Sequence, residues 1–168
     1  MDRFEDQAND VLLTQKAREP VNTTKAYEGK EKEFLDYLLD VYSDESNPQL
    51  ITPAKCFGFM FYAANRDKRR SQKNSYALFD REEYDRIMSM KPGNDKKIGN
   101  VCGIQTITHY LAAIRRLIDT QRESGLSELR REDIMTPKMK ALVKSVLNRN
   151  EIVMKSQFKE RTTGAFEP

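Results

Sequence analysis

The sequence has few of the residues that small domains use to build metal sites and disulfide frameworks. It contains two cysteines, Cys56 and Cys102, a single histidine, His109, and no tryptophan. A structural zinc site needs four ligands, drawn mainly from cysteine and histidine at short spacings, so we expect no metal. Two isolated cysteines suit a reducing compartment, although one disulfide between them stays open at this stage.

Long apolar runs are also missing. No stretch approaches the about 18 consecutive apolar residues that mark a membrane span, and the acidic start MDRFEDQAND lacks the apolar centre of a signal peptide. We therefore expect a soluble protein with no membrane partner, in the nucleus if eukaryotic and in the cytoplasm otherwise. The sequence has no Gly-rich phosphate loop and no nucleophile–base pair, so we expect neither a cofactor nor enzymatic activity.

Signals for β-strands are weak, because alternating apolar runs and Asn-Gly or Asp-Gly hairpin turns are missing. Helix signals recur instead, and 168 residues suit one domain with its own core. We predict an all-α fold, a compact bundle of five or six helices. The expected organisation is an N-terminal arm with a short helix (1–21), a helical core domain (22–161), and a tail or linker to a missing following domain (162–168).

Individual helices are predicted from their caps and stops. Thr52 followed by Pro53 is a cap and then a proline at the first helical position, and Asp80 with Glu83 resembles a capping box. Gly125 is a stop signal. The helix after Pro53 is apolar on nearly every side, so it is either central in the bundle or covered by another molecule. Helices are expected at about 7–18, 22–42, 53–64, 81–90, 102–123 and 137–161.

Charge is unevenly distributed along the chain, although the net charge is only +3. Residues 1–50 hold 6 basic and 12 acidic side chains, whereas residues 51–168 hold 23 and 14. A basic remainder behind an acidic start suggests one surface for a polyanion. Lysine and arginine that merely solvate helices remain the alternative.

Residues 102–123 form the clearest predicted helix. At about 100° per residue, its apolar side chains fall in one stripe: Ile104, Ile107, Leu111, Ile114 and Ile118. The opposite face is small, polar and cationic: Gln105, His109, Ala112, Ala113, Arg116 and Thr120. Glutamine and arginine can read base edges, and a helix fits the major groove of DNA. An ordinary amphipathic helix with a solvated outer face is the alternative.

Three segments resemble the N-terminal core-binding domain of tyrosine recombinases and phage integrases. NTTKAYEGKEKEFLDYL (22–38) is similar to the first helix of that domain, and ITPAKCFGFMFYAANR (51–66) stands where its second helix lies. THYLAAIRRLIDTQRESGL (108–126) resembles its fourth helix, with the pattern L-x-A-[IV]-R-R-L. The resemblance implies a helical, SAM-like clamp over double-stranded DNA, with self-association on DNA as a further expectation.

A longer basic insert (66–79) resembles the Crypton-type recombinases and the fungal centromere-binding proteins related to them. In this family catalysis belongs to a separate, following domain with a His-x-x-Arg motif, and here His109 is followed by Tyr110, Leu111 and Ala112. No catalytic residue is therefore expected in this chain. A helical protein-interaction module is the alternative function. The predicted DNA contacts are Lys55, Lys68, Arg69, Arg70, Lys73, Lys96, Lys97, Gln105, Thr106, His109 and Arg116.

Overall fold

The structure is a computed structural model that describes residues 21–68, 78–90 and 101–163. These residues form an all-helical bundle, which confirms the predicted fold class. Within the described ranges no strand is present, and an isolated bridge between Asp67 and Val101 is the one β-type pairing. The elements are α2 (Val21–Val41), α3 (Pro53–Asn65), α4 (Arg81–Met88), α5 (Ile104–Glu123), a 3-10 turn η1 (Arg131–Ile134) and α6 (Pro137–Thr163).

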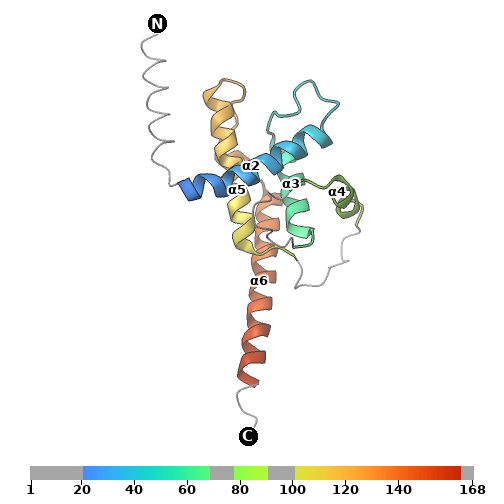
Figure 1. The fold of residues 1–168 in the computed structure, drawn as a ribbon, viewed down its shortest axis with the longest axis vertical. Coiled ribbons are helices and arrows are strands. Elements are labelled where there is room, and N and C mark those ends of the chain that lie inside the picture. The colour runs from blue at the N-terminus through green and yellow to red at the C-terminus, as the bar shows by residue number, and fades with distance from the viewer. Residues whose placement is uncertain (1–20, 69–77, 91–100, 164–168) are drawn as a thin grey trace.

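Helix α3 is central, as its all-round apolar sequence allowed. It contacts α2, α4, α6 and η1 as well as α5 (Figure 1). Thr52 caps its N-terminus by accepting a hydrogen bond from the backbone N–H of Lys55, and Pro53 occupies the first turn, where its missing N–H costs nothing. Seven of its thirteen residues are buried, so this helix is covered by the chain itself.

Aromatic rings fill the centre of the core. Tyr37 of α2 packs on Phe59 of α3 with ring centroids 5.2 Å apart, and Phe59 packs on Tyr110 of α5 at 5.4 Å. These contacts tie together three helices that lie far apart in sequence. The approach of α2 to α3 is close at Gly58, where an added Cβ would lie 2.7 Å from the Tyr37 hydroxyl oxygen.

Most helix ends lie where the sequence signals place them. Asp80 caps α4 by accepting a hydrogen bond from the N–H of Glu83, and Gly125 adopts a φ of 73° just beyond α5, a conformation that favours glycine. Three bounds differ from the prediction by two residues: α4 ends at Met88, α5 begins at Ile104, and α6 continues through residues 162–163, whereas both ends of α2 and the end of α3 differ by one. The helix expected at 7–18 lies outside the described residues.

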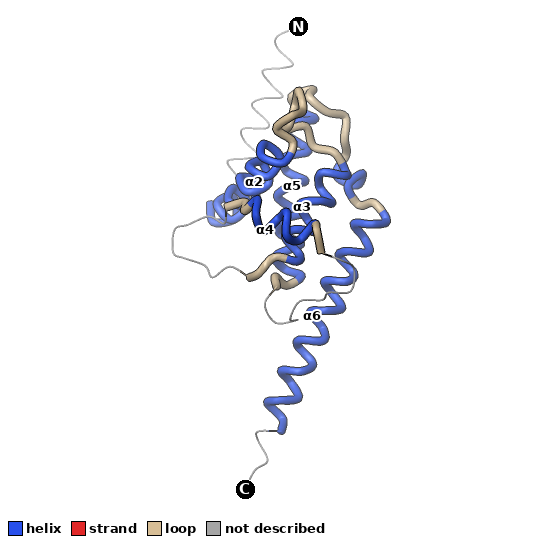
Figure 2. The backbone as a smooth tube through the Cα atoms, turned by 90° about the vertical axis from the view of Figure 1, so that its right-hand side faces the viewer, coloured by secondary structure: helices blue, strands red, loops and turns tan. Residues whose placement is uncertain are grey.

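Helix α6 is the longest element and only its first half packs on the bundle (Figure 2). Met139 and Val146 are buried against the core, whereas Met154 and Phe158 are mostly exposed. In both views the second half extends away from the other described helices. None of the helices in the described part of the chain combines the length and the apolar character needed to cross a membrane.

Candidate nucleic-acid interface

The solvent side of α5 differs from the predicted one. Ile107, Leu111, Ile114 and Ile118 are buried as expected, but Ala113, predicted on the outer face, is also fully buried. Tyr110 and Leu117, on the same side as Ala113, extend the buried arc there. The helix is therefore rotated relative to the prediction. The solvent side of α5, called the exposed face below, consists of the exposed residues Gln105, Thr108, His109, Thr120, Arg122 and Glu123 and the partly exposed Ala112, Arg115 and Asp119.

Arg116 does not lie free on this face, and that prediction is wrong. Helix α2 crosses α5 here, and the guanidinium of Arg116 stacks over the Tyr27 ring at 5.3 Å. Its Nε lies 3.4 Å from Oε1 of Glu31, and its side chain is 24% exposed. Arg116 therefore joins α5 to α2 instead of presenting its charge to solvent. His109 is exposed, with its ring edge-on to Tyr27 at 6.4 Å.

Arg122, which is exposed, and Arg115, which is partly exposed, take the role predicted for Arg116. Within residues 21–68, 78–90 and 101–163, neither guanidinium forms an ion pair. Asp119 lies between them on the same face, but Nε of Arg131 donates to its carboxylate at 2.7 Å. Because Arg131 balances that acid, Arg115 and Arg122 outweigh the other carboxylate on this face, Glu123, and the face keeps a net positive charge. Sequence reasoning missed them because it centred the core on Ile104 and left out Tyr110 and Leu117.

Lys55 was predicted to contact DNA, and the structure contradicts this. Its side chain is 5% exposed. The ammonium donates to Oε2 of Glu45 at 2.6 Å and to the backbone carbonyls of Pro48 at 3.1 Å and Leu50 at 3.0 Å. All three hydrogens of the ammonium are thus used inside the protein. Lys55 fastens the loop after α2 to the start of α3.

Arg66 opens the predicted basic insert, yet it is a buried core residue. Its guanidinium pairs with the Glu33 carboxylate, and Nη2 donates to the Tyr110 hydroxyl at 2.5 Å. The Tyr110 hydroxyl in turn donates to Glu33, which closes a network across α2, α3 and α5. Burial lowers the pKa of Arg66, but Glu33 and Tyr110 raise it overall, so the charge is retained. Burial is also the main cause that raises the Tyr110 pKa.

One signal in the sequence could have revealed the buried acid of this network, Glu33, but not its partner. Glu33 lies four residues before Tyr37, so it falls on the buried face of α2. A carboxylate on such a face needs a cationic partner, because a buried, unpaired charge is very costly. The partner, Arg66, is 33 residues away, and no local pattern identifies it.

The structure describes only some of the other residues that were predicted to contact DNA. Gln105 is exposed in the first turn of α5, and Thr106 is partly buried at the edge of the core. Lys68 is exposed and follows Asp67, whose bridge to Val101 sets Lys68 close to the start of α5. Arg69, Arg70, Lys73, Lys96 and Lys97 lie outside the described residues.

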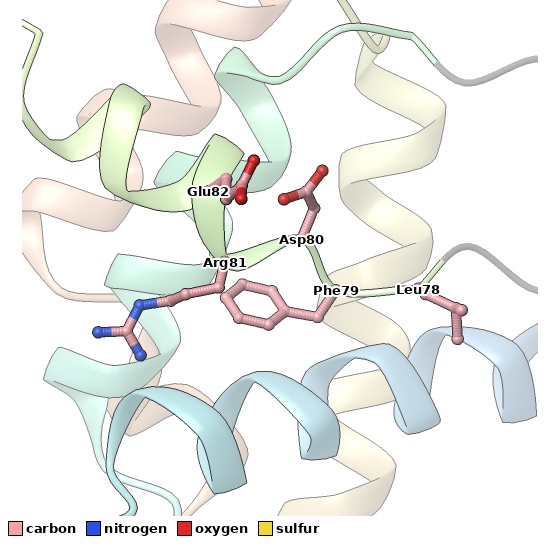
Figure 3. A pocket seen from close by; sticks show the side chains of 5 residues that line it. All are labelled: Leu78, Phe79, Asp80, Arg81 and Glu82. Carbon is pink, nitrogen blue, oxygen red and sulfur yellow. The ribbon is translucent and has the colours of Figure 1, made fainter.

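An open hollow beside the start of α4 offers no catalytic arrangement (Figure 3). Its lining includes Phe79, which packs on Tyr37 and Tyr62, and Arg81, which pairs with Asp85 and Asp40. These side chains therefore serve the packing of α4. Among the residues that the structure describes, no group of His, Cys, Asp and Glu could hold a metal ion.

Both cysteines are free thiols buried in the core. Burial raises the pKa of Cys56 to about 12. The Cys102 thiol lies 2.9 Å from the carbonyl oxygen of Ala63, and burial raises its pKa as well. Neither thiol is positioned as a nucleophile, because both are buried and burial disfavours the thiolate form.

Comparison of the chain with protein-family models, with curated proteins and with solved structures gave no match.

Proposed function

We propose that this chain is a duplex-DNA-binding domain without catalytic activity, and that the exposed face of α5 contacts the DNA. The observation that carries the proposal is the pair of arginines, Arg115 and Arg122, on a face whose intervening acid, Asp119, is bound by Arg131. An ordinary solvated helix would leave that acid to balance the arginines. This helix presents cationic charge together with exposed polar side chains.

The face is divided along the helix. Gln105 and His109 lie in the first turns, where they would reach base edges. Arg115 and Arg122 are seven residues apart, about 10 Å along the axis, and would contact phosphates. Ala112 separates the two groups, and its small side chain would let the backbone of α5 approach the duplex. Phosphate contacts would supply most of the affinity and base contacts the selectivity.

Two further features favour contact with DNA at the N-terminal end of α5. Gly103 provides no side-chain cap to α5, so the first N–H groups of the helix remain suited to a phosphate. Lys68 lies near that end. The predicted contacts in the undescribed loops (Arg69, Arg70, Lys73, Lys96 and Lys97) would add phosphate neutralisation there.

The biological setting is proposed from the resemblance to tyrosine recombinases alone. We infer a role in DNA recombination or integration, as in Crypton-type elements, or in a domesticated relative acting in the nucleus. The catalytic residues of such a protein would lie in a domain outside this chain. Self-association on DNA belongs to the same proposal.

The test is a fluorescence anisotropy titration of labelled duplex with wild-type protein and matched arginine variants. Arg115→Ala and Arg122→Ala should each weaken binding by about 1–3 kcal/mol. Arg86→Ala is the control, because Arg86 is an exposed arginine of α4 that pairs with Glu83. If Arg115→Ala and Arg122→Ala bind like Arg86→Ala, the exposed face of α5 is not the DNA-binding surface.

A further inference from the structure

The start of α2 supplies one aromatic ring to the exposed face of α5, where the two helices cross (Figure 1). Tyr27 of α2 is partly exposed. The guanidinium of Arg116 lies over its ring at 5.3 Å, and the imidazole of His109 meets the ring edge-on at 6.4 Å, with the two ring planes at 88°. His109 and Arg116 are two helical turns apart, so they lie on one side of α5. Tyr27 reaches both of them.

The ring of Tyr27 is held from the Arg116 side. Nε of Arg116 lies 3.4 Å from Oε1 of Glu31, and the arginine side chain is 24% exposed. Glu31 and Tyr27 are four residues apart, so they are neighbours on the surface of α2. The guanidinium is thus fixed to α2 at two points, and the tyrosine ring on which it stacks has little freedom to change rotamer.

His109, in contrast, is an exposed side chain that would sample several rotamers by itself. Its edge-to-face contact with Tyr27 favours one of them. A pair of this geometry is worth a preference of about two- to tenfold for the paired arrangement. A contact with a base edge needs a ring nitrogen that points in one direction, because hydrogen bonds weaken steeply as their angle departs from linear. The tyrosine therefore provides what a base contact by His109 requires.

We propose that Tyr27 is a positioning residue for DNA recognition, and that its ring holds the imidazole of His109 in the orientation that reaches a base edge. The inference rests on the proposed function, because it needs the exposed face of α5 to contact DNA. It adds a residue of α2 to the determinants of selectivity. Tyr27 acts through His109 and leaves the phosphate contacts of Arg115 and Arg122 unchanged.

The experiment measures selectivity, defined as the ratio of dissociation constants for two duplexes. One is the duplex that wild-type protein enriches from a pool of random sequences, and the other is a scrambled form of it. Tyr27→Ala should lower the selectivity about two- to tenfold and leave the affinity for the scrambled duplex unchanged, because phosphate contacts supply that affinity. Tyr27→Phe keeps the ring and should keep the selectivity of the wild type. Tyr42→Ala is the matched control, because Tyr42 is a partly exposed tyrosine directly after the other end of α2 and packs on Tyr37.

A double-mutant cycle separates positioning from an independent role of the tyrosine. His109→Ala should lower the selectivity about tenfold. Adding Tyr27→Ala to it should cause no further loss, because no imidazole is left to orient. Tyr27→Leu keeps much of the side-chain volume without the ring, so it gives the same test if Tyr27→Ala is destabilised in urea denaturation.

Nuclear magnetic resonance tests the positioning in the free protein. His109 is the sole histidine of the chain, so its imidazole signals are identified directly. They should stay in place in Tyr27→Phe and move in Tyr27→Ala, because the neighbouring aromatic ring is then lost.

Additive losses in the cycle, or wild-type selectivity in Tyr27→Ala, would overturn the inference while leaving DNA binding by α5 in place. Equal losses in Tyr27→Ala and Tyr42→Ala would overturn it too, by showing that any weakening of α2 packing has this effect. A wild-type protein that binds neither duplex would instead remove the proposed function, and the inference with it.

Discussion

The network of Glu33, Arg66 and Tyr110 gives the sharpest prediction about stability. Arg66→Met removes the guanidinium that balances a carboxylate only 1% exposed. Breaking a buried ion pair in this way typically costs about 3–5 kcal/mol, because the remaining charge stays buried. Glu33→Met should cost a similar amount for the same reason. Both changes approach the whole stability of a small domain, which is about 5–15 kcal/mol.

The double variant separates the ion pair from simple loss of packing. Replacing Glu33 and Arg66 together with methionine leaves no charge in the core, so it should cost far less than the sum of the two single changes. The coupling in this double-mutant cycle should reach at least about 2 kcal/mol. Tyr110→Phe deletes one hydroxyl from the network and should cost about 1–2 kcal/mol. This variant should therefore stay folded, so that its free energy of unfolding can be measured.

Urea denaturation followed by far-ultraviolet circular dichroism measures these changes, and anisotropy with duplex DNA measures function in parallel. The folded Arg66→Met protein should bind DNA like wild type, because Arg66 is buried. Additive single and double effects would refute the ion-pair reasoning. Near-normal stability with weakened DNA binding would show that Arg66 acts at the surface, as its position in the basic insert first suggested.

Three other predictions follow from single sites. Lys55→Met should cost about 2–3 kcal/mol in urea denaturation, because three part-buried hydrogen bonds of the ammonium are lost, and leave DNA affinity unchanged; weaker binding by the folded variant would argue against its internal role. Gly58→Ala should cost about 1–3 kcal/mol, because the added Cβ meets the Tyr37 hydroxyl; a thermal midpoint equal to wild type would contradict this close contact. Burial raises the pKa of Cys56 from 9.0 to about 12 and also raises that of Tyr37, so the stability they contribute is complete below pH 9.0 and is lost as the pH rises toward 12. Alkaline titration should therefore show a tyrosinate absorbance step that coincides with unfolding, whereas ionisation of every tyrosine in the folded protein would contradict it.

Local signals predicted most of the fold. The Thr52-Pro53 start, the Asp80 cap and the glycine at 125 each act within a few residues, so the sequence alone places the corresponding helix ends. The all-α class followed from the same signals. From its apolar sequence, α3 was expected to be either central in the bundle or covered by another molecule. Its packing against the other helices of the chain shows that it is central.

The candidate site was harder to predict because it depends on contacts between distant segments. Arg116 looked exposed on a helical wheel, but α2 supplies Tyr27 and Glu31 to cover and pair it. Lys55 looked like a phosphate contact, but the loop after α2 folds back over it. Helical periodicity shows which residues share a face. It does not show which neighbouring helix covers the edge of that face.

The dependence of DNA affinity on salt tests the central claim most directly. Neutralising about five phosphates predicts a slope near −4 to −5 in a plot of log K against log salt concentration. The Arg115→Gln/Arg122→Gln variant should lower the size of that slope by about 2, because each arginine releases about one counterion. An unchanged slope, or a flat response of the wild-type protein, would contradict binding through the exposed face of α5.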